Sequence, residues 1–261
     1  MNAVVTGVSA AGGLVLGDAL EILVERLGAR RSLERPWWGC PTCESSPSTL
    51  GFVPVARAWA RRVPCPSCGH STEHAWRPAA LAVAGAAVLG GFAARIGADT
   101  SLAAYAVFGL ALVAIAAVDL ERQIIPNRIV YPALGIMVPL LVVASAVDDR
   151  WGALGRAAIG GAGAFAAFYA VHVAVPRGMG FGDVRLAGVI GVATGWLGYG
   201  PLFIAFLAAF VLGALIGVVA MAVTGAGRKT RIPFGPFLAA GAVVAVLWGA
   251  PLAHTLFHRG T

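Results

Sequence analysis

The chain has 261 residues, of which 59% are hydrophobic and 12% are charged. Soluble domains carry about 25% charged residues, so this composition excludes a disordered chain and argues against an ordinary soluble domain. The net charge of +7 does not indicate a nucleic-acid partner, because the basic residues gather between apolar segments. The sequence therefore predicts a protein embedded in the lipid bilayer.

Apolar segments follow one another along most of the chain. A transmembrane helix needs about 20 apolar residues, and candidates lie at 3–24, 79–97, 101–118, 129–147, 157–175, 186–200, 201–223 and 233–252. The first candidate is weakened by Asp18 and Glu21, and the sixth is short and rich in glycine. We predict an all-α membrane protein, a bundle of about eight transmembrane helices.

The basic residues give this bundle an orientation. Loops on the cytoplasmic side collect Lys and Arg. If the polar block 26–78 is cytoplasmic, fifteen of the nineteen basic residues fall on that side. Only Arg95, Arg150, Arg156 and Arg259 fall on the other. We therefore expect a multi-pass protein of the inner (cytoplasmic) membrane with both termini outside.

Glycines four residues apart occur in three of the predicted helices. The pairs are Gly13/Gly17, Gly191/Gly195 and Gly213/Gly217. This spacing places two glycines on one helix face, where small residues let neighbouring helices approach closely in lipid. The pattern predicts tight packing within the bundle.

Four cysteines stand in the polar block as two C-x-x-C pairs. Cys40 and Cys43 form the first pair, and Cys65 and Cys68 form the second. Two such pairs can close a tetrahedral four-thiolate site around a structural Zn²⁺. Two disulfide or redox pairs are the alternative, but disulfides are rare on a cytoplasmic loop. We predict a first transmembrane helix (1–25), a cytoplasmic zinc-binding loop domain (26–78) and a polytopic membrane domain (79–261).

Acidic residues at the ends of apolar helices are the candidate catalytic groups. Ionisable side chains in such positions are costly and mark functional sites by default. Asp119 ends the third predicted helix, where a negative charge opposes the helix dipole. Asp183 stands just before the sixth, where it could also serve as an N-cap. Both fall on the predicted cytoplasmic side at similar depth.

Two carboxylates brought together share a proton. The ionised one can then activate a water while the protonated one polarises a carbonyl, as in aspartic proteases. Gly180 and Gly182 precede Asp183 and would give an extended substrate peptide close access to the backbone. Asp18 and Glu21 share a helix face. They could bind a positive substrate group or pair with arginine from the nearby loop.

At these residues the chain resembles the prepilin leader peptidases, which are membrane aspartic proteases of the GxGD type. Residues 180–183 read Gly-Phe-Gly-Asp, and Asp119 is followed by Ile-Pro-Asn at 125–127. Residues 233–237 read Pro-Phe-Gly-Pro-Phe, and the paired cysteines match the family's cytoplasmic zinc loop. The resemblance covers most of the chain.

The resemblance implies an enzyme that removes the short basic leader of type IV prepilin or pseudopilin precursors. It also implies a cut after a glycine, before the precursor's hydrophobic helix, with Asp119 and Asp183 as the catalytic dyad facing the cytoplasm. Many bacterial members also methylate the new N-terminus with S-adenosylmethionine.

The half of the family associated with methyl transfer is less well matched. Residues 17–21 read Gly-Asp-Ala-Leu-Glu, where the family has Gly-Ser-Phe-Leu-Asn, and residues 75–81 lack the family's carboxylate. We therefore expect cleavage with weak or absent methylation. A bifunctional peptidase and N-methyltransferase is one alternative, and a non-enzymatic membrane assembly or transport subunit is another.

Overall fold

The computed structural model describes residues 2–28, 67–69, 76–175, 178–224 and 233–257. These residues form eight α-helices and no strand. The helices are α1 (Asn2–Gly28), α3 (Arg77–Ile96), α4 (Leu102–Arg122), α5 (Asn127–Asp148), α6 (Trp151–Ala174), α7 (Phe181–Leu197), α8 (Tyr199–Thr224) and α9 (Gly235–Phe257).

Seven of these helices are long and apolar enough to cross a membrane. The exception is α7, which has 17 residues and coincides with the weak sixth segment of the sequence. The prediction of an all-helical membrane protein is confirmed. Most of the predicted zinc-binding loop lies outside the described residues.

The sequence placed three helix boundaries wrongly. α6 begins at Trp151 rather than near 157, and α9 continues through Pro251 to Phe257. α7 begins at Phe181 rather than near 186, so Asp183 is not the N-cap. It lies in the first turn of the helix, three residues after the N-cap Gly180.

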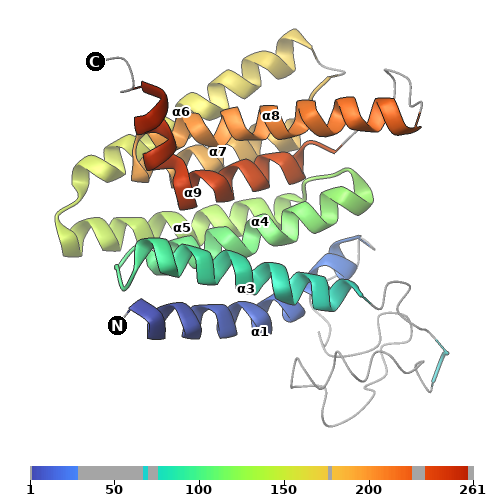
Figure 1. Cartoon of the computed structure of the whole chain (residues 1–261), viewed down its shortest axis with the longest axis horizontal. Helices are drawn as coiled ribbons and strands as arrows, with labels where there is room; N and C mark the ends of the chain where they lie inside the picture. Colours follow the sequence, from blue (N-terminus) through green and yellow to red (C-terminus); the bar gives the residue numbers. More distant parts are fainter. Residues whose placement is uncertain (1, 29–66, 70–75, 176–177, 225–232, 258–261) are drawn as a thin grey trace.

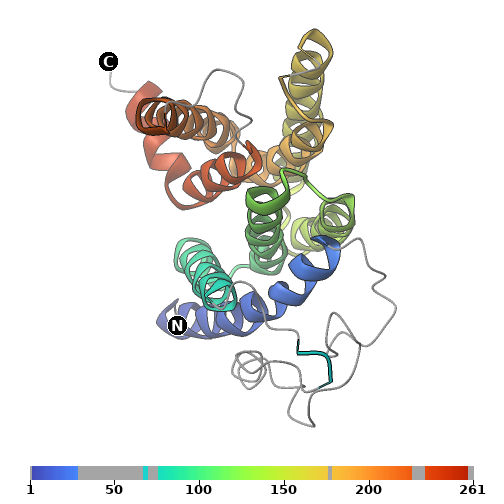
Figure 2. The same cartoon turned by 90° about the vertical axis from the view of Figure 1, so that its right-hand side faces the viewer.

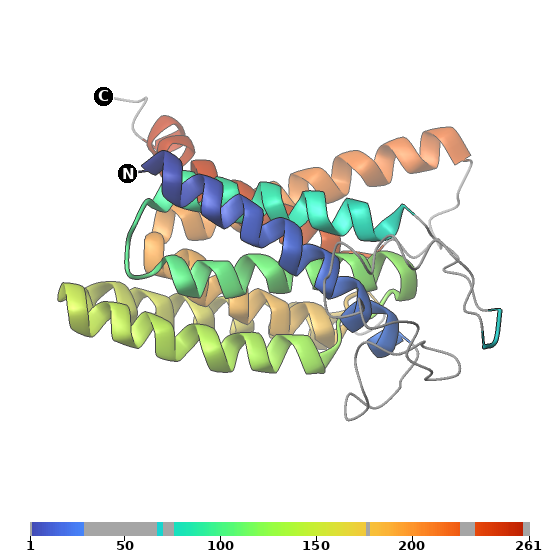
Figure 3. The same ribbon diagram turned by 90° about the horizontal axis from the view of Figure 1, so that it is seen from below.

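The helices lie side by side as three tight pairs around a central helix. α1 packs along α3, α6 along α7 and α8 along α9, while α4 contacts α3, α5 and α9. Figure 2 shows α4 in the middle of the bundle, between the α1/α3 pair and the α8/α9 pair. The start of α1 and the end of α9 lie at one end of the bundle, and the α4–α5 turn lies at the other (Figures 1 and 3). This arrangement agrees with the predicted placement of both termini on one side.

Two of the three glycine pairs hold helices together. A Cβ on Gly17 would lie 2.3 Å from the Leu81 carbonyl oxygen, and one on Gly191 would lie 2.4 Å from that of Gly160. No side chain fits at such distances, so α1/α3 and α6/α7 meet backbone to backbone. The third pair differs, because Gly213 faces the rings of Phe234 and Phe237 rather than a helix backbone.

An ion-pair cluster closes the end of the bundle that carries the termini. Asp99, in the α3–α4 turn, accepts hydrogen bonds from the Ser101 amide at 2.9 Å and hydroxyl at 2.6 Å. Arg150, in the α5–α6 turn, contacts it at 2.7 Å. Burial alone would raise the pKa of Asp99, but these partners outweigh it and hold the pKa below its ordinary 3.8. The cluster ties two turns together at this end.

Candidate active site

Asp119 lies in the last turn of α4 and is 4% exposed. Its Oδ2 accepts a hydrogen bond of 2.9 Å from the backbone N–H of Gly235, the first residue of α9. The negative charge of Asp119 is unfavourable at the C-terminal end of α4, but here it faces the N-terminal end of α9, where the helix dipole stabilises a negative charge. This contact explains locally how a carboxylate is accommodated at the C-terminal end of a helix.

Asp183 lies in the first turn of α7. Its Oδ2 accepts a hydrogen bond of 3.1 Å from the backbone N–H of Gly180. Each candidate carboxylate thus receives one amide from the N-terminal end of a helix, α9 for Asp119 and α7 for Asp183.

The fold brings the two aspartates to the same end of the bundle, where α7 meets the α4–α5 turn at Gly182 and Ile125. α9 contacts both α4 and α7. Deeper in the bundle, the buried Tyr105 hydroxyl of α4 donates a hydrogen bond of 2.6 Å to the Ala193 carbonyl oxygen of α7. The two helices that carry the aspartates are therefore held in a fixed relation.

The glycines before Asp183 lie against parts of this same chain. A Cβ on Gly182 would lie 2.8 Å from the Ile125 Cβ, so this glycine lets α7 approach the α4–α5 turn. A Cβ on Gly180 would lie 3.2 Å from the Asp183 Oδ2. The predicted contact of Gly180 and Gly182 with a substrate peptide stays a prediction, but Gly182 already has a role within the fold.

A polar contact joins two residues that follow the aspartates in the sequence, Asn127 and Arg185. The Arg185 guanidinium of α7 donates a hydrogen bond from Nη1 to the Asn127 Oδ1 at the start of α5. It also stacks on Phe181, with Cζ 4.3 Å from the ring centroid. Arg185 therefore contacts Asn127 of the Ile-Pro-Asn segment and Phe181 of the Gly-Phe-Gly-Asp segment. The sequence analysis did not predict these contacts.

Glu21 is buried beside an arginine. Its side chain is 2% exposed, and its two carboxylate oxygens each lie 2.8 Å from the Arg77 Nε. Arg77 also donates from Nη1 to the Glu121 Oε1 at 2.6 Å. Of the two alternatives for Glu21, the structure contains the arginine pair. The side chain of Asp18 lies outside the described part, so its predicted substrate role stays a prediction.

The zinc prediction concerns residues that are mostly outside the described part. Cys40, Cys43 and Cys65 are not described, while Cys68 is exposed in a turn at 67–69. Within the described residues no group of three or more metal-binding side chains forms a site. This search does not reach the predicted four-cysteine site.

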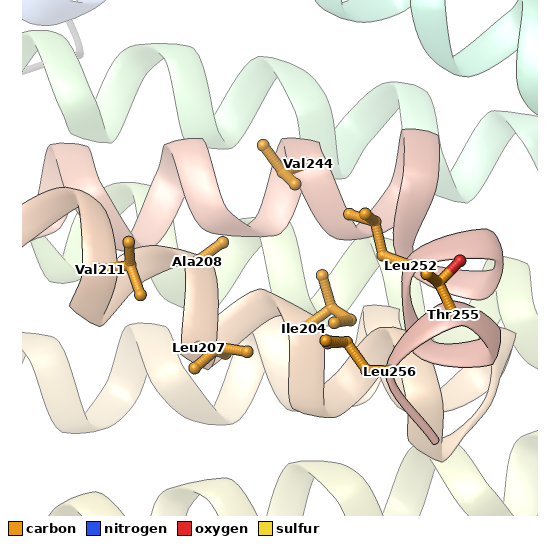
Figure 4. A pocket seen from close by; sticks show the side chains of 8 residues that line it. All are labelled: Ile204, Leu207, Ala208, Val211, Val244, Leu252, Thr255 and Leu256. Carbon is orange, nitrogen blue, oxygen red and sulfur yellow. The ribbon is translucent and has the colours of Figure 1, made fainter. Parts of the chain in front are cut away.

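Two hollows differ in their relation to the aspartates. One has about 260 Å³ between α8 and α9, with the apolar lining shown in Figure 4. Its polar group is the Thr255 hydroxyl, which is bonded to the Pro251 carbonyl oxygen at 2.9 Å. The other has about 540 Å³ between α3, α4 and α9, and Pro236 on its wall is next to Gly235. The second hollow therefore adjoins the amide that binds Asp119.

A bundle of membrane-length helices that brings two carboxylates to one end has the layout of a membrane aspartic peptidase. Comparison with known proteins agrees. The family described as "Type IV leader peptidase family" matches residues 106–218, which include both aspartates. The chain belongs to this family, and it is an integral membrane peptidase.

Several curated relatives align with almost the whole chain. The "Prepilin leader peptidase/N-methyltransferase" of Bacillus subtilis (strain 168) is 31% identical over 91% of this chain and 92% of its own length. The protein of that name from Stutzerimonas stutzeri is 29% identical over 89% and 78%. The one from Burkholderia pseudomallei (strain 1026b) is 32% identical over 92% and 84%. No solved structure matches the chain.

Proposed function

We propose that this chain cuts the short basic leader from type IV prepilin-like precursors at the cytoplasmic face of the inner membrane, with Asp119 and Asp183 as the catalytic dyad. The observation that supports the proposal is the placement of both carboxylates at one end of the bundle, each bound by a backbone amide at the start of a helix. The names of the relatives support the substrate class.

The geometry suits hydrolysis by a proton-sharing pair. The Gly235 amide fixes one oxygen of Asp119, and the Gly180 amide fixes one oxygen of Asp183. In each carboxyl group the second oxygen is left for water or the scissile carbonyl. The ionised carboxylate takes a proton from the attacking water, and the protonated one donates a hydrogen bond to the carbonyl oxygen. The water oxygen adds to the carbonyl carbon and gives a tetrahedral diol. The carboxyl group that took the water's proton then passes it to the amide nitrogen, and the C–N bond breaks to give a carboxylic acid and an amine.

Isosteric amides test the dyad. We expect Asp119→Asn and Asp183→Asn each to abolish cleavage of a prepilin-type precursor in membranes, because an amide neither accepts the proton nor shares it. Asp149→Asn is the matched control, since Asp149 is an exposed residue at the opposite end of the bundle. Asn also tolerates the left-handed backbone of that position, where φ is 54°. Near-normal cleavage by either dyad variant would refute the assignment.

Methylation is the second activity in the relatives' printed names. We propose that it is weak or absent here. Glu21, the carboxylate best placed to replace the missing acidic residue, is engaged by Arg77. The intact mass of the mature precursor's N-terminal peptide, after incubation with S-adenosylmethionine, decides this. An enzyme-dependent gain of one methyl group would favour the bifunctional alternative.

A structural Zn²⁺ held by Cys40, Cys43, Cys65 and Cys68 is a further part of the proposal. Four thiolates leave no position for a reacting water, so the metal would order the cytoplasmic loop and take no part in hydrolysis. Support comes from the chemistry of the donor set and from its arrangement as two C-x-x-C pairs.

A further inference from the structure

The hollow between α3, α4 and α9 is a groove with a polar mouth. Its α3 wall extends from Trp76 to Val88, which is roughly 18 Å at 1.5 Å per residue. Arg77 and Glu121 lie at one end, and the remaining lining is almost entirely apolar. α3 and α9 both pack on α4, and they meet at Gly91, where a Cβ would lie 3.2 Å from the Leu247 side chain.

The position of the groove connects it to the candidate active site. α4 provides its floor through one face of its last turns, from Leu112 to Glu121. Asp119 lies on a different face of the same turns and is bound by the start of α9. α9 provides Pro236, whose neighbour Gly235 binds the Asp119 carboxylate. A chain segment lying in the groove would therefore leave it beside the dyad.

The lining favours a helix as the occupant. Small side chains from all three helices form much of the wall: Ala80, Ala84, Ala116, Ala117, Ala239 and Ala240. In lipid, small residues let another helix approach closely. The length of the groove matches about three helical turns.

The charged residues at the mouth of the groove are complementary to a basic segment of a substrate. The Arg77 guanidinium is shared between Glu21 and Glu121, so these three groups together carry one net negative charge. The buried Glu21 is 2% exposed, whereas Glu121 is 32% exposed and available to solvent. A negative mouth above an apolar groove suits a segment whose basic part precedes its apolar part. It disfavours the anionic head group of a lipid.

We propose that this groove binds the apolar helix of the uncleaved precursor, with Glu121 facing the basic leader. The inference rests on the proposed prepilin peptidase function and names where that substrate lies. Binding in the groove presents the bond between leader and helix to Asp119.

Photocrosslinking in membranes tests the proposal with the full-length chain made inactive by Asp183→Asn. Benzoyl-phenylalanine replaces Leu120, which lines the groove and is 64% exposed. The matched control replaces Leu215 of α8, which is 59% exposed and lies outside the groove. We expect a crosslink to the precursor's apolar segment from position 120, at roughly tenfold or greater yield than from position 215.

A second comparison fills the groove. Ala117→Phe overpacks the floor and should lower both this crosslink and kcat/KM for the precursor roughly tenfold. Ala166→Phe, on an exposed face of α6, should change neither. Glu121→Gln should weaken binding about two- to fivefold, the size of an exposed ion pair, and only when the leader is basic.

The outcomes separate this inference from the proposed function. Equal yields from positions 120 and 215, crosslinks to lipid alone, or equal effects of Ala117→Phe and Ala166→Phe would overturn the groove as the binding site. Failure of the unmodified chain to cut the precursor in the same membranes would instead refute the peptidase proposal. The crosslink needs no catalysis and is read in either case.

Discussion

Gly235→Ala should separate the dyad geometry from the stability of the fold. The added Cβ would lie 2.6 Å from the Asp119 Oδ2 and 3.0 Å from its Cγ. The atoms in the way belong to a side chain that can rotate, so the carboxylate gives way rather than the bundle. Rotation breaks the 2.9 Å bond from the Gly235 amide, and bonds to charged groups are worth about 1.5–3 kcal/mol.

A shift of the carboxylate by about 1 Å can cost roughly 10²-fold in rate. We therefore expect kcat for precursor cleavage to fall by about this factor, while the thermal denaturation midpoint in detergent falls only by the few degrees that the loss of one hydrogen bond costs. The assay compares cleavage per folded molecule. Gly163→Ala is the control, because nothing lies within 4 Å of the added Cβ. Cleavage by Gly235→Ala at the rate of the control would show the reasoning wrong.

Three further predictions concern stability and metal content. Gly191→Ala would place a Cβ 2.4 Å from the Gly160 carbonyl oxygen, so we expect a loss of about 1–3 kcal/mol, measured as a lower thermal midpoint. Asp99→Asn removes the contact with Arg150 and should cost about 1 kcal/mol or less near neutral pH. Because the pKa of Asp99 is lower in the folded chain, this stabilisation is lost as the pH falls through the folded pKa, and the two proteins should converge in acid. Metal analysis should find one zinc per chain, and Cys40→Ser should lower that content and loosen the loop; a metal-free protein with two disulfides would contradict this.

Local patterns in the sequence were enough for the helices and for the position of the aspartates. Apolar segments of membrane length predicted all eight helices, and the glycine spacing in α1 and α7 predicted the close contacts at Gly17 and Gly191. The same spacing did not predict the contact at Gly213. Glycine spacing shows that one face of a helix carries small residues, but it does not show which residues pack against that face. Aromatic rings of Phe234 and Phe237 take that place.

The contacts that organise the site could not be predicted, because they join residues far apart in the chain. The Gly235 amide and the Asp119 carboxylate are separated by 116 residues, and Arg77 and Glu21 by 56. One signal did point to the first of these contacts. A glycine followed by proline at the start of an apolar segment, as Gly235 and Pro236 are, offers a helix N-terminal amide with no side chain over it, and such an amide suits an anion. Asp119 ends a helix where its negative charge has no local partner, and the amide of Gly235 begins another helix. These two groups attract each other, so they pair once the bundle brings the end of α4 next to the start of α9.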